Sequence, residues 1–148
     1  MAGNNLDKAT LIELLALVNG TNTLPAIAQL DSLGRLTDNV AATASLQQLD
    51  GSRMVEEYVD GSGTAENPFA VLLRVKPKDS NDRADAAGAL MALGDALELT
   101  WHSGTLPEGW SRLEGVSTAT LIERDEDGSE IWRASFVLES ERGAPALA

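Results

Sequence analysis

The sequence predicts an α+β fold in which helices pack on one face of a mainly antiparallel sheet. The clearest strand covers residues 69–76, where apolar side chains occupy every second position. Near the C-terminus, Asp127-Gly128 separates two further strand-like segments and has the composition of a tight hairpin turn. An alanine-rich segment with apolar residues at helical spacing lies between these regions. Hairpin strands with a helix to cover one face are typical of α+β proteins.

The N-terminal region is predicted to form one helix over about residues 7–19. Asp7 can cap its first turn, apolar residues follow at helical spacing, and Asn19-Gly20 supplies a stop signal. Residues 21–38 contain a proline, a glycine and several turn formers. We therefore expect a loop there, with one short helical turn over residues 26–30.

Strand-like patterns begin at about residue 40. Residues 40–49 are a weak candidate for a strand because they are rich in alanine and glutamine. Residues 53–59 are a better candidate for a strand, because they contain valine, methionine and tyrosine. Residues 60–68 contain two glycines and a proline. They are expected to form a turn or loop before the strand at 69–76.

The C-terminal half is predicted to contain one long helix and one hairpin. A cluster of possible capping residues at 79–82 opens a helix that runs to about Leu97, and its small side chains allow close packing against a sheet. Glycines and a proline predict a loop over residues 100–110. The hairpin then pairs residues 116–122 with residues 130–138.

The length of 148 residues suits a single domain over residues 1–148. We expect its sheet and helix core at about residues 38–139 and a mobile tail at residues 140–148. The sequence has no run of about 18 apolar residues and no signal-peptide pattern at its start, so no membrane association is expected. It contains no cysteine, which excludes disulfides and thiolate metal sites and fits synthesis in a reducing cytosol.

The net charge is −12, and acidic residues occur along the whole chain. Because proteins bind DNA by neutralising phosphates with lysine and arginine, no direct sequence-specific binding of nucleic acid is expected. One basic run stands out where the best strand ends and the next helix begins. It consists of Arg74, Lys76, Lys78 and Arg83. These residues are either ordinary surface charge, offset by nearby aspartates, or a contact for an acidic face of a neighbouring subunit.

No catalytic, cofactor-binding or metal-binding site is predicted. The single histidine, His102, lacks the partners of a metal pair or a catalytic triad. Asp125-x-Asp127-Gly128 is similar to the start of a calcium loop, but the required glycine and glutamate are missing at its sixth and twelfth positions. Glu56 and Glu57 are neighbours in a strand, so they point to opposite faces and cannot act together as acid and base. We expect that the protein is not an enzyme.

Part of this pattern is similar to a known family. A predicted strand leads into the turn Tyr58-Val-Asp-Gly-Ser62, and the next predicted strand begins with the aromatic residue Phe69. The helix that follows contains Arg83-Ala-Asp-Ala-Ala-Gly-Ala-Leu90. A last hairpin ends with Ile131-Trp-Arg-Ala-Ser-Phe-Val-Leu138. Over roughly residues 38–142, the chain resembles the minor capsid or tail terminator proteins of long-tailed bacteriophages.

The resemblance implies a homo-oligomeric ring, usually a hexamer, that caps the head-proximal end of the tail tube and joins the tail to the head. Its implied partners are further copies of the chain, the major tail tube protein and a head–tail connector or neck protein. It implies no enzymatic activity and no cofactor. The implied location is the virion, after synthesis in the host bacterial cytoplasm.

The resemblance also implies where the contacts lie. The loop 60–67 and the strand-to-helix corner 76–83 are expected to touch neighbouring subunits or the tube. The expected interface residues are Asp60, Gly61, Ser62, Glu66, Arg74, Lys76, Lys78 and Arg83.

Other functions are compatible with the same sequence. Another neck, head-completion or minor capsid component would share the pattern, and binding to purified tube protein would separate it from a terminator. A non-viral α+β module could use the sheet face to bind a peptide or small ligand. An enzyme would require carboxylates that converge from distant segments.

Overall fold

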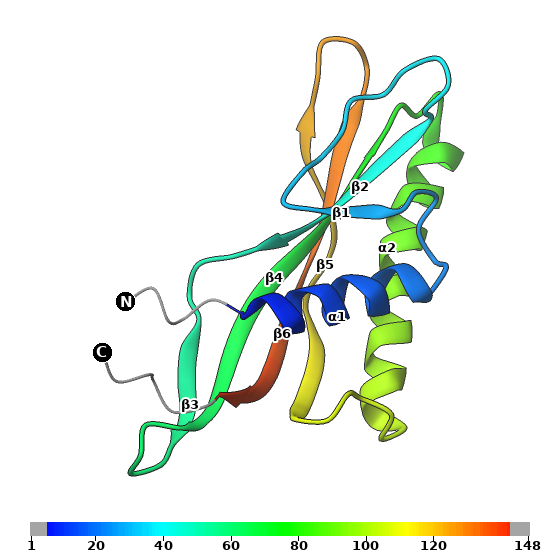
Figure 1. Ribbon diagram of the computed structural model, residues 1–148. Coiled ribbons are helices and arrows are strands. Elements are labelled where there is room, and N and C mark those ends of the chain that lie inside the picture. The colour runs from blue at the N-terminus through cyan, green and yellow to red at the C-terminus, as the bar shows by residue number, and fades with distance from the viewer. Residues whose placement is uncertain (1–5, 143–148) are drawn as a thin grey trace.

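The computed structural model describes residues 6–142, in which two helices accompany one six-stranded sheet (Figure 1). The predicted α+β fold with a mainly antiparallel sheet is confirmed. In chain order, the elements are α1 (Lys8–Gly20), β1 (Ala28–Leu30), β2 (Ala42–Gln48), β3 (Arg53–Glu57), β4 (Gly63–Val75), α2 (Ser80–His102), β5 (Trp110–Arg124) and β6 (Glu130–Arg142).

The sheet is organised around β4. Along its whole length β4 pairs antiparallel with β6, and β5 pairs antiparallel with the far side of β6. The other edge of β4 is shared, because β3 pairs with residues 63–66 and β2 pairs with residues 69–75. The short β1 then pairs parallel with β2, so the order across the sheet is β1-β2-β4-β6-β5.

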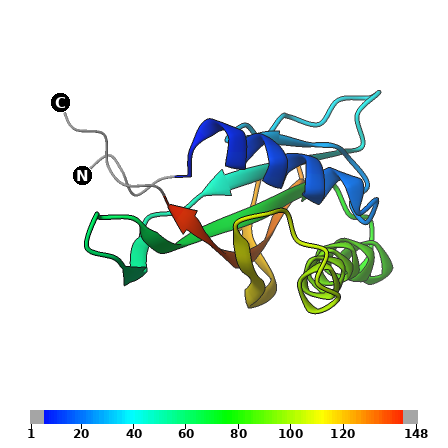
Figure 2. The same cartoon turned by 60° about the horizontal axis from the view of Figure 1, so that its bottom comes forward.

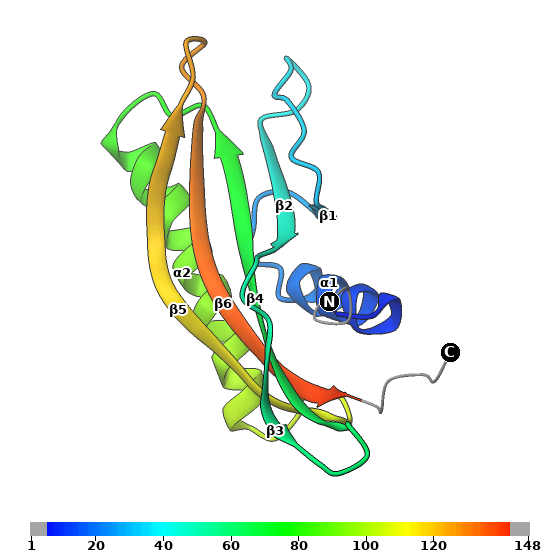
Figure 3. The same cartoon turned by 90° about the vertical axis from the view of Figure 1, so that its left-hand side faces the viewer.

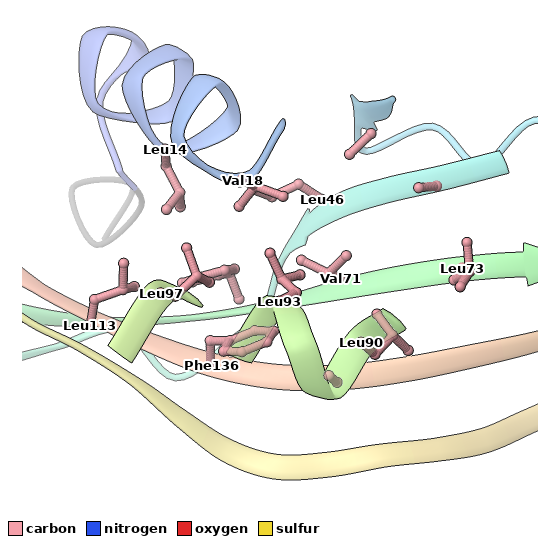
Figure 4. Packing of buried hydrophobic residues seen from close by; sticks show 14 of the residues in the cluster. Leu14, Val18, Leu46, Val71, Leu73, Leu90, Leu93, Leu97, Leu113 and Phe136 are labelled. Carbon is pink, nitrogen blue, oxygen red and sulfur yellow. The ribbon is translucent and has the colours of Figure 1, made fainter. Parts of the chain in front are cut away.

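Both helices contribute to one hydrophobic core on one face of this sheet. Phe69 of β4 and Phe136 of β6 pair directly, and their rings stack with centroids 5.3 Å apart. Figure 4 shows Leu14 and Val18 of α1 approaching the same core as Leu93 of α2. The core also includes Leu46, Val71, Leu73, Leu90, Leu97, Leu113, Ala134 and Leu138. α1 lies across the strands, whereas α2 runs alongside β5 and β6 (Figures 1 and 3).

The helix α2 begins where the capping cluster predicts, because the Asp79 side chain accepts a hydrogen bond from the Asp82 backbone N–H at 3.1 Å. It ends later than predicted, at His102 instead of about Leu97. No helix-breaking residue follows Leu97 until Gly104, which has a positive φ of 75°. The first residues of the predicted loop 100–110 are therefore helical.

The helical turn expected over residues 26–30 is wrong, because the structure has the strand β1 there. The Ala28 N–H donates to the Asn19 side chain at 2.8 Å, and the Asn19 amide donates back to the Ala28 carbonyl at 3.2 Å. This exchange holds the chain extended beside β2. Such contacts between distant residues override the local preference for a turn.

The turn expected over residues 60–68 is shorter than predicted, because β4 already begins at Gly63. Pro68 is accommodated within this strand at the point where β3 pairing has ended and β2 pairing begins. The Pro68 carbonyl accepts a hydrogen bond from the Leu49 N–H at 3.1 Å, just beyond the end of β2, so the missing N–H of proline lies outside the ladders with β2 and β3.

The tail expected at residues 140–148 also needs correction. The antiparallel pairing of β6 with β4 continues to Arg142 opposite Gly63, and Ser140 is buried. Residues 140–142 therefore belong to the sheet, and residues 143–148 lie outside the described residues. The hairpin strands are likewise longer than predicted, since the β5–β6 pairing continues to Trp110 opposite Ser140.

We expect Leu93→Ala to lower the free energy of unfolding by about 2–5 kcal/mol, because it removes a fully buried side chain and leaves a cavity. Chemical denaturation followed by circular dichroism measures this loss. Met91→Ala, on the exposed side of the same helix, is the matched control and should change stability little. Equal effects for both variants would contradict the packing of α2.

We expect removal of residues 140–148 to destabilise the protein by about 1–3 kcal/mol more than removal of residues 143–148 alone. The longer deletion removes paired strand residues, including the Glu141 N–H that donates to the Gly109 carbonyl at 2.7 Å. Thermal unfolding of both truncated chains tests the expectation. Identical melting curves would show that the end of β6 contributes nothing.

Candidate assembly surfaces

The eight predicted contact residues fall into two groups at opposite ends of β4. Asp60, Gly61 and Ser62 form the turn before this strand, and Glu66 follows within it. Arg74 lies near its other end, and the remaining basic residues follow it. A strand of 13 residues rises about 3.3 Å per residue, so its ends are roughly 40 Å apart (Figure 3). The predicted residues therefore form two surfaces.

The first surface comprises the end of β3 and the turn that leads into β4, and we call it the hairpin tip (residues 56–62). The Ser62 N–H and hydroxyl both donate to the Asp60 carboxylate, at 2.9 and 2.5 Å. These bonds lower the pKa of Asp60 below its ordinary value. Gly61 has a positive φ of 87°, and the Tyr58 N–H donates to the Ser62 carbonyl at 2.7 Å. The tip is thus a defined turn with a charged carboxylate.

Two exposed apolar side chains extend this tip beyond the predicted residues. Val59 is fully exposed and Tyr58 is 55% exposed, and exposed carboxylates of Glu56 and Glu57 precede them. The Glu56 carboxylate raises the pKa of the Tyr58 hydroxyl by its negative charge. Sequence reasoning assigned Tyr58 and Val59 to a strand and did not name them as candidate contacts. Their position next to the Asp60-Gly61 turn was the available signal.

Glu66 differs from the tip residues because it belongs to an ion-pair network within the chain. Its carboxylate accepts hydrogen bonds from Arg53 at 3.2 Å and from Arg112 at 2.6 Å. Arg112 also bonds Glu114 and Glu139, and the hydrogen bond with Glu114 is the main cause that raises its pKa. This network joins β3, β4, β5 and β6 on the face away from the helices. Glu66 is therefore occupied by intramolecular partners.

The second surface lies at the corner between β4 and α2, where Arg83 also has an intramolecular partner. Its Nε donates to both oxygens of the Glu130 carboxylate, at 3.2 and 3.1 Å, and the Arg124 Nε donates to the same carboxylate at 2.8 Å. Glu130 is only 1% exposed. Burial raises its pKa, but the hydrogen bonds from Arg124 and Arg83 outweigh burial and lower it overall. Arg83 thus ties α2 to the β5–β6 hairpin.

The other three basic residues, Arg74, Lys76 and Lys78, form what we call the basic corner. Within residues 6–142 none of them makes an ion pair, and the side chains of both lysines are exposed. The Asp127 carboxylate lies close enough to two of these residues for their charges to influence its pKa. Hydrogen bonds from Ser129 are the main cause that lowers the pKa of Asp127, and the positive charges of Lys76 and Arg74 lower it further. The lysines are therefore available to a partner.

A groove of about 520 Å³ opens beside the basic corner, and we call it the corner groove. It lies between the α1–β1 connection, the start of β2 and the first turns of α2. Its lining is mostly apolar and includes Leu24, Pro25, Ala41, Val75 and Pro77, with Lys76 among the lining residues. Asp82 and Asp85 also line it, and Asp82 accepts a hydrogen bond from the Lys78 backbone N–H at 2.8 Å.

A second, smaller groove of about 250 Å³ lies between α2 and β5. The exposed side chains of Met91 and Val116 are among its lining residues. Asp95 and Glu98 also line it, and the Glu98 carboxylate accepts a hydrogen bond from the Gly115 N–H at 2.9 Å. This groove is therefore acidic as well as apolar.

The sequence features considered for chemistry are dispersed in the structure. His102 sits in the last turn of α2 with its ring 4.2 Å from that of Trp101, and it is exposed. Across residues 6–142 no group of three or more histidine, aspartate or glutamate side chains could hold a metal ion. Neither helix in this part of the chain is long and apolar enough to cross a membrane.

The chain was compared with family models, curated proteins and solved structures. No family model and no curated protein matches the sequence. Among solved structures, the chain is similar to a chain described as part of the virion of a native gene transfer agent particle. The TM-score is 0.59 and the identity is 16%, and the match covers 92% of this chain and 100% of that chain. At this identity the similarity shows a shared fold across nearly the whole described structure.

We expect Glu130→Gln to lower the free energy of unfolding at neutral pH by about 1–3 kcal/mol. This is below the ~3–5 kcal/mol for a fully buried pair, because the Arg83 and Arg124 side chains remain 41% and 58% exposed. The pKa of Glu130 is lower in the folded chain than its ordinary value of 4.5, so the ionised carboxylate stabilises the folded protein above pH 4.5. This stabilisation is lost as the pH falls through the folded-state pKa.

The stability difference between the wild type and Glu130→Gln should therefore shrink below about pH 4. Urea titrations at several pH values measure it. Glu126→Gln, on the exposed turn of the same hairpin, is the matched control and should behave like the wild type at each pH. A difference that stays constant with pH would show that the Glu130 charge does not stabilise this junction.

Proposed function

We propose that this chain is a structural protein of a phage-like particle. The observation that carries the proposal is its fold similarity, over 92% of its length, to a chain from the virion of a gene transfer agent particle. The match also covers the whole of that chain. The common feature is therefore a complete subunit fold, which is what a shared structural role would preserve.

Within such a particle, we propose that the chain is the tail terminator, a homo-oligomeric ring at the head-proximal end of the tail tube. The family resemblance over residues 38–142 supports this assignment. A ring built from identical subunits needs two different complementary surfaces on each subunit. The hairpin tip and the basic corner lie at opposite ends of β4 and can supply two such surfaces.

The proposed mechanism is steric: the seated ring leaves no surface on which another tube subunit can assemble. The long edge strand β5 supports this idea, because its pairing with β6 has four register irregularities. Irregular edge strands resist the addition of a further strand. The opposite edge is formed by two short strands, β1 with three residues and β3 with five. The sheet therefore offers poor templates for continued growth by strand pairing.

In this role the partners are other copies of the chain, the tail tube protein and a connector or neck protein. The charge of −12 suits a ring through which DNA passes, because an acidic inner surface repels phosphates and lets DNA slide. Such a protein acts through its surfaces, without a bound cofactor.

We expect deletion of the gene from the producing phage-like genome to give full heads beside unjoined, overlong tails, because nothing would stop tube growth. Negative-stain electron microscopy of the lysate measures tail length and joining. Supplying the gene from a plasmid is the control and should restore joined particles. Tails of normal length beside unjoined heads would instead indicate a head-side neck component, and intact infectious particles would refute a virion role.

A further inference from the structure

We propose that the hairpin tip of one copy docks in the corner groove of the next copy, with Val59 and Tyr58 inserted and the acidic end of β3 close to Lys76 and Lys78. This inference deepens the proposed function, because it names the contact that would join neighbouring subunits. The partner is a second copy of this chain. The contact is head to tail, since the two surfaces are different.

The hairpin tip has the properties of an inserting element. It projects at one end of the molecule, on the side opposite α2 (Figure 2). Val59 is fully exposed and Tyr58 is more than half exposed. Tyrosine provides a large rigid contact with a polar end, which makes it common in the centre of interfaces. Hydrogen bonds around Asp60 and Ser62 define the turn before binding, so little conformational freedom is lost on docking.

The corner groove has the properties of a matching receptor. Its apolar lining includes Leu24, Pro25 and Val75, and its volume is about 520 Å³. A groove of ~300–1,000 Å³ is large enough to accept a few side chains. Lys76 and Pro77 are among the residues that line the groove, and Lys78 is the next residue in the sequence. An inserted segment with apolar side chains and neighbouring carboxylates would contact both the apolar lining and the lysines.

Charge makes the pairing specific. Residues 56–60 carry three carboxylates and no basic residue, whereas residues 74–78 carry three basic residues and no carboxylate. Elsewhere, Arg53, Arg83, Arg112 and Arg124 are already held in ion pairs within the chain. The basic corner thus offers unpaired cations in an otherwise acidic protein. Complementary charges of this kind favour the correct register and partner.

The groove between α2 and β5 is the competing receptor, and its charge argues against it. Asp95 and Glu98 line that groove, so they would face the carboxylates of an inserted hairpin tip. Like charges placed together at an interface oppose binding. Asp82 and Asp85 line the corner groove too, but Lys76 is also part of its lining.

The absence of cysteine in the wild-type sequence allows a direct test by disulfide crosslinking. A chain carrying both Val59→Cys and Ala41→Cys should form a ladder of covalently linked copies on oxidation at millimolar concentration. A mixture of the two single variants should give dimers only. The control chain combines Val59→Cys with Val116→Cys, which places the second cysteine at the competing groove. A ladder from that control alone would overturn the proposal.

Charge reversal in the same cysteine background tests the pairing itself. Glu56→Lys/Glu57→Lys and Lys76→Glu/Lys78→Glu should each reduce crosslinking roughly tenfold, because attraction becomes repulsion. Mixing these two variants should restore crosslinking, since the reversed tip then meets a reversed corner and the normal tip a normal corner. Failure of this rescue would overturn the proposal, and recovery shows that both variants are folded.

Matched controls carry the same change of charge at exposed positions elsewhere. They are Glu13→Lys/Glu108→Lys and Lys8→Glu/Arg133→Glu, and both should crosslink like the parent chain. The test uses purified protein, so it is independent of the gene-deletion experiment. No ladder in any variant, together with overlong tails on deletion, would overturn this contact while leaving the terminator function intact.

Discussion

The antiparallel ladder between β4 and β6 is the constraint on which the rest of the structure depends. It joins thirteen residue pairs, from Gly63 opposite Arg142 to Val75 opposite Glu130. Its register places Phe69 against Phe136 at the centre of the core. A shift of one residue would turn the apolar side chains of either strand toward the other face and expose them to water. Both helices pack against the face that this register defines.

The same ladder also sets the distance between the two candidate assembly surfaces. One end of β4 continues from the hairpin tip and the other leads into the basic corner. Each end is secured by ion pairs: Arg112 links Glu66 to Glu139 near the first, and Glu130 links Arg83 to Arg124 at the second. These pairs occupy arginines within the chain, so the unpaired cations at the corner stand out. The charge pattern available to partners is therefore a result of folding.

Local sequence signals succeeded where an element is defined by its own residues. The alternation of residues 69–76 predicted the C-terminal half of β4, and Asp127-Gly128 predicted the turn between β5 and β6. They failed where pairing with distant segments decides the outcome. β1 exists because it lies beside β2 and exchanges hydrogen bonds with Asn19, and residues 63–68 are extended because β3 and β6 pair with them.

For the candidate surfaces, the sequence identified the acidic turn and the basic run but not their relation. Contiguous residues such as Arg74, Lys76 and Lys78 could be read as one cluster, because neighbours in sequence are neighbours in space. The separation of this cluster from Asp60 could not be read, since it depends on an unbroken strand through Pro68. The loss of Arg83 and Glu66 to internal ion pairs was equally hidden, because their partners are 47 and 46 residues away.

By itself, the sequence determined the fold class, the acidic character and most of the helix and strand positions, because apolar periodicity and charge are properties of local composition. Only the tertiary structure decided how far each strand extends, which charges are neutralised and which apolar side chains stay exposed. Those outcomes depend on pairing between segments far apart in the chain. Val59 shows the difference: its sequence neighbours suggest a strand, and only the sheet leaves it exposed at the end of a projecting hairpin.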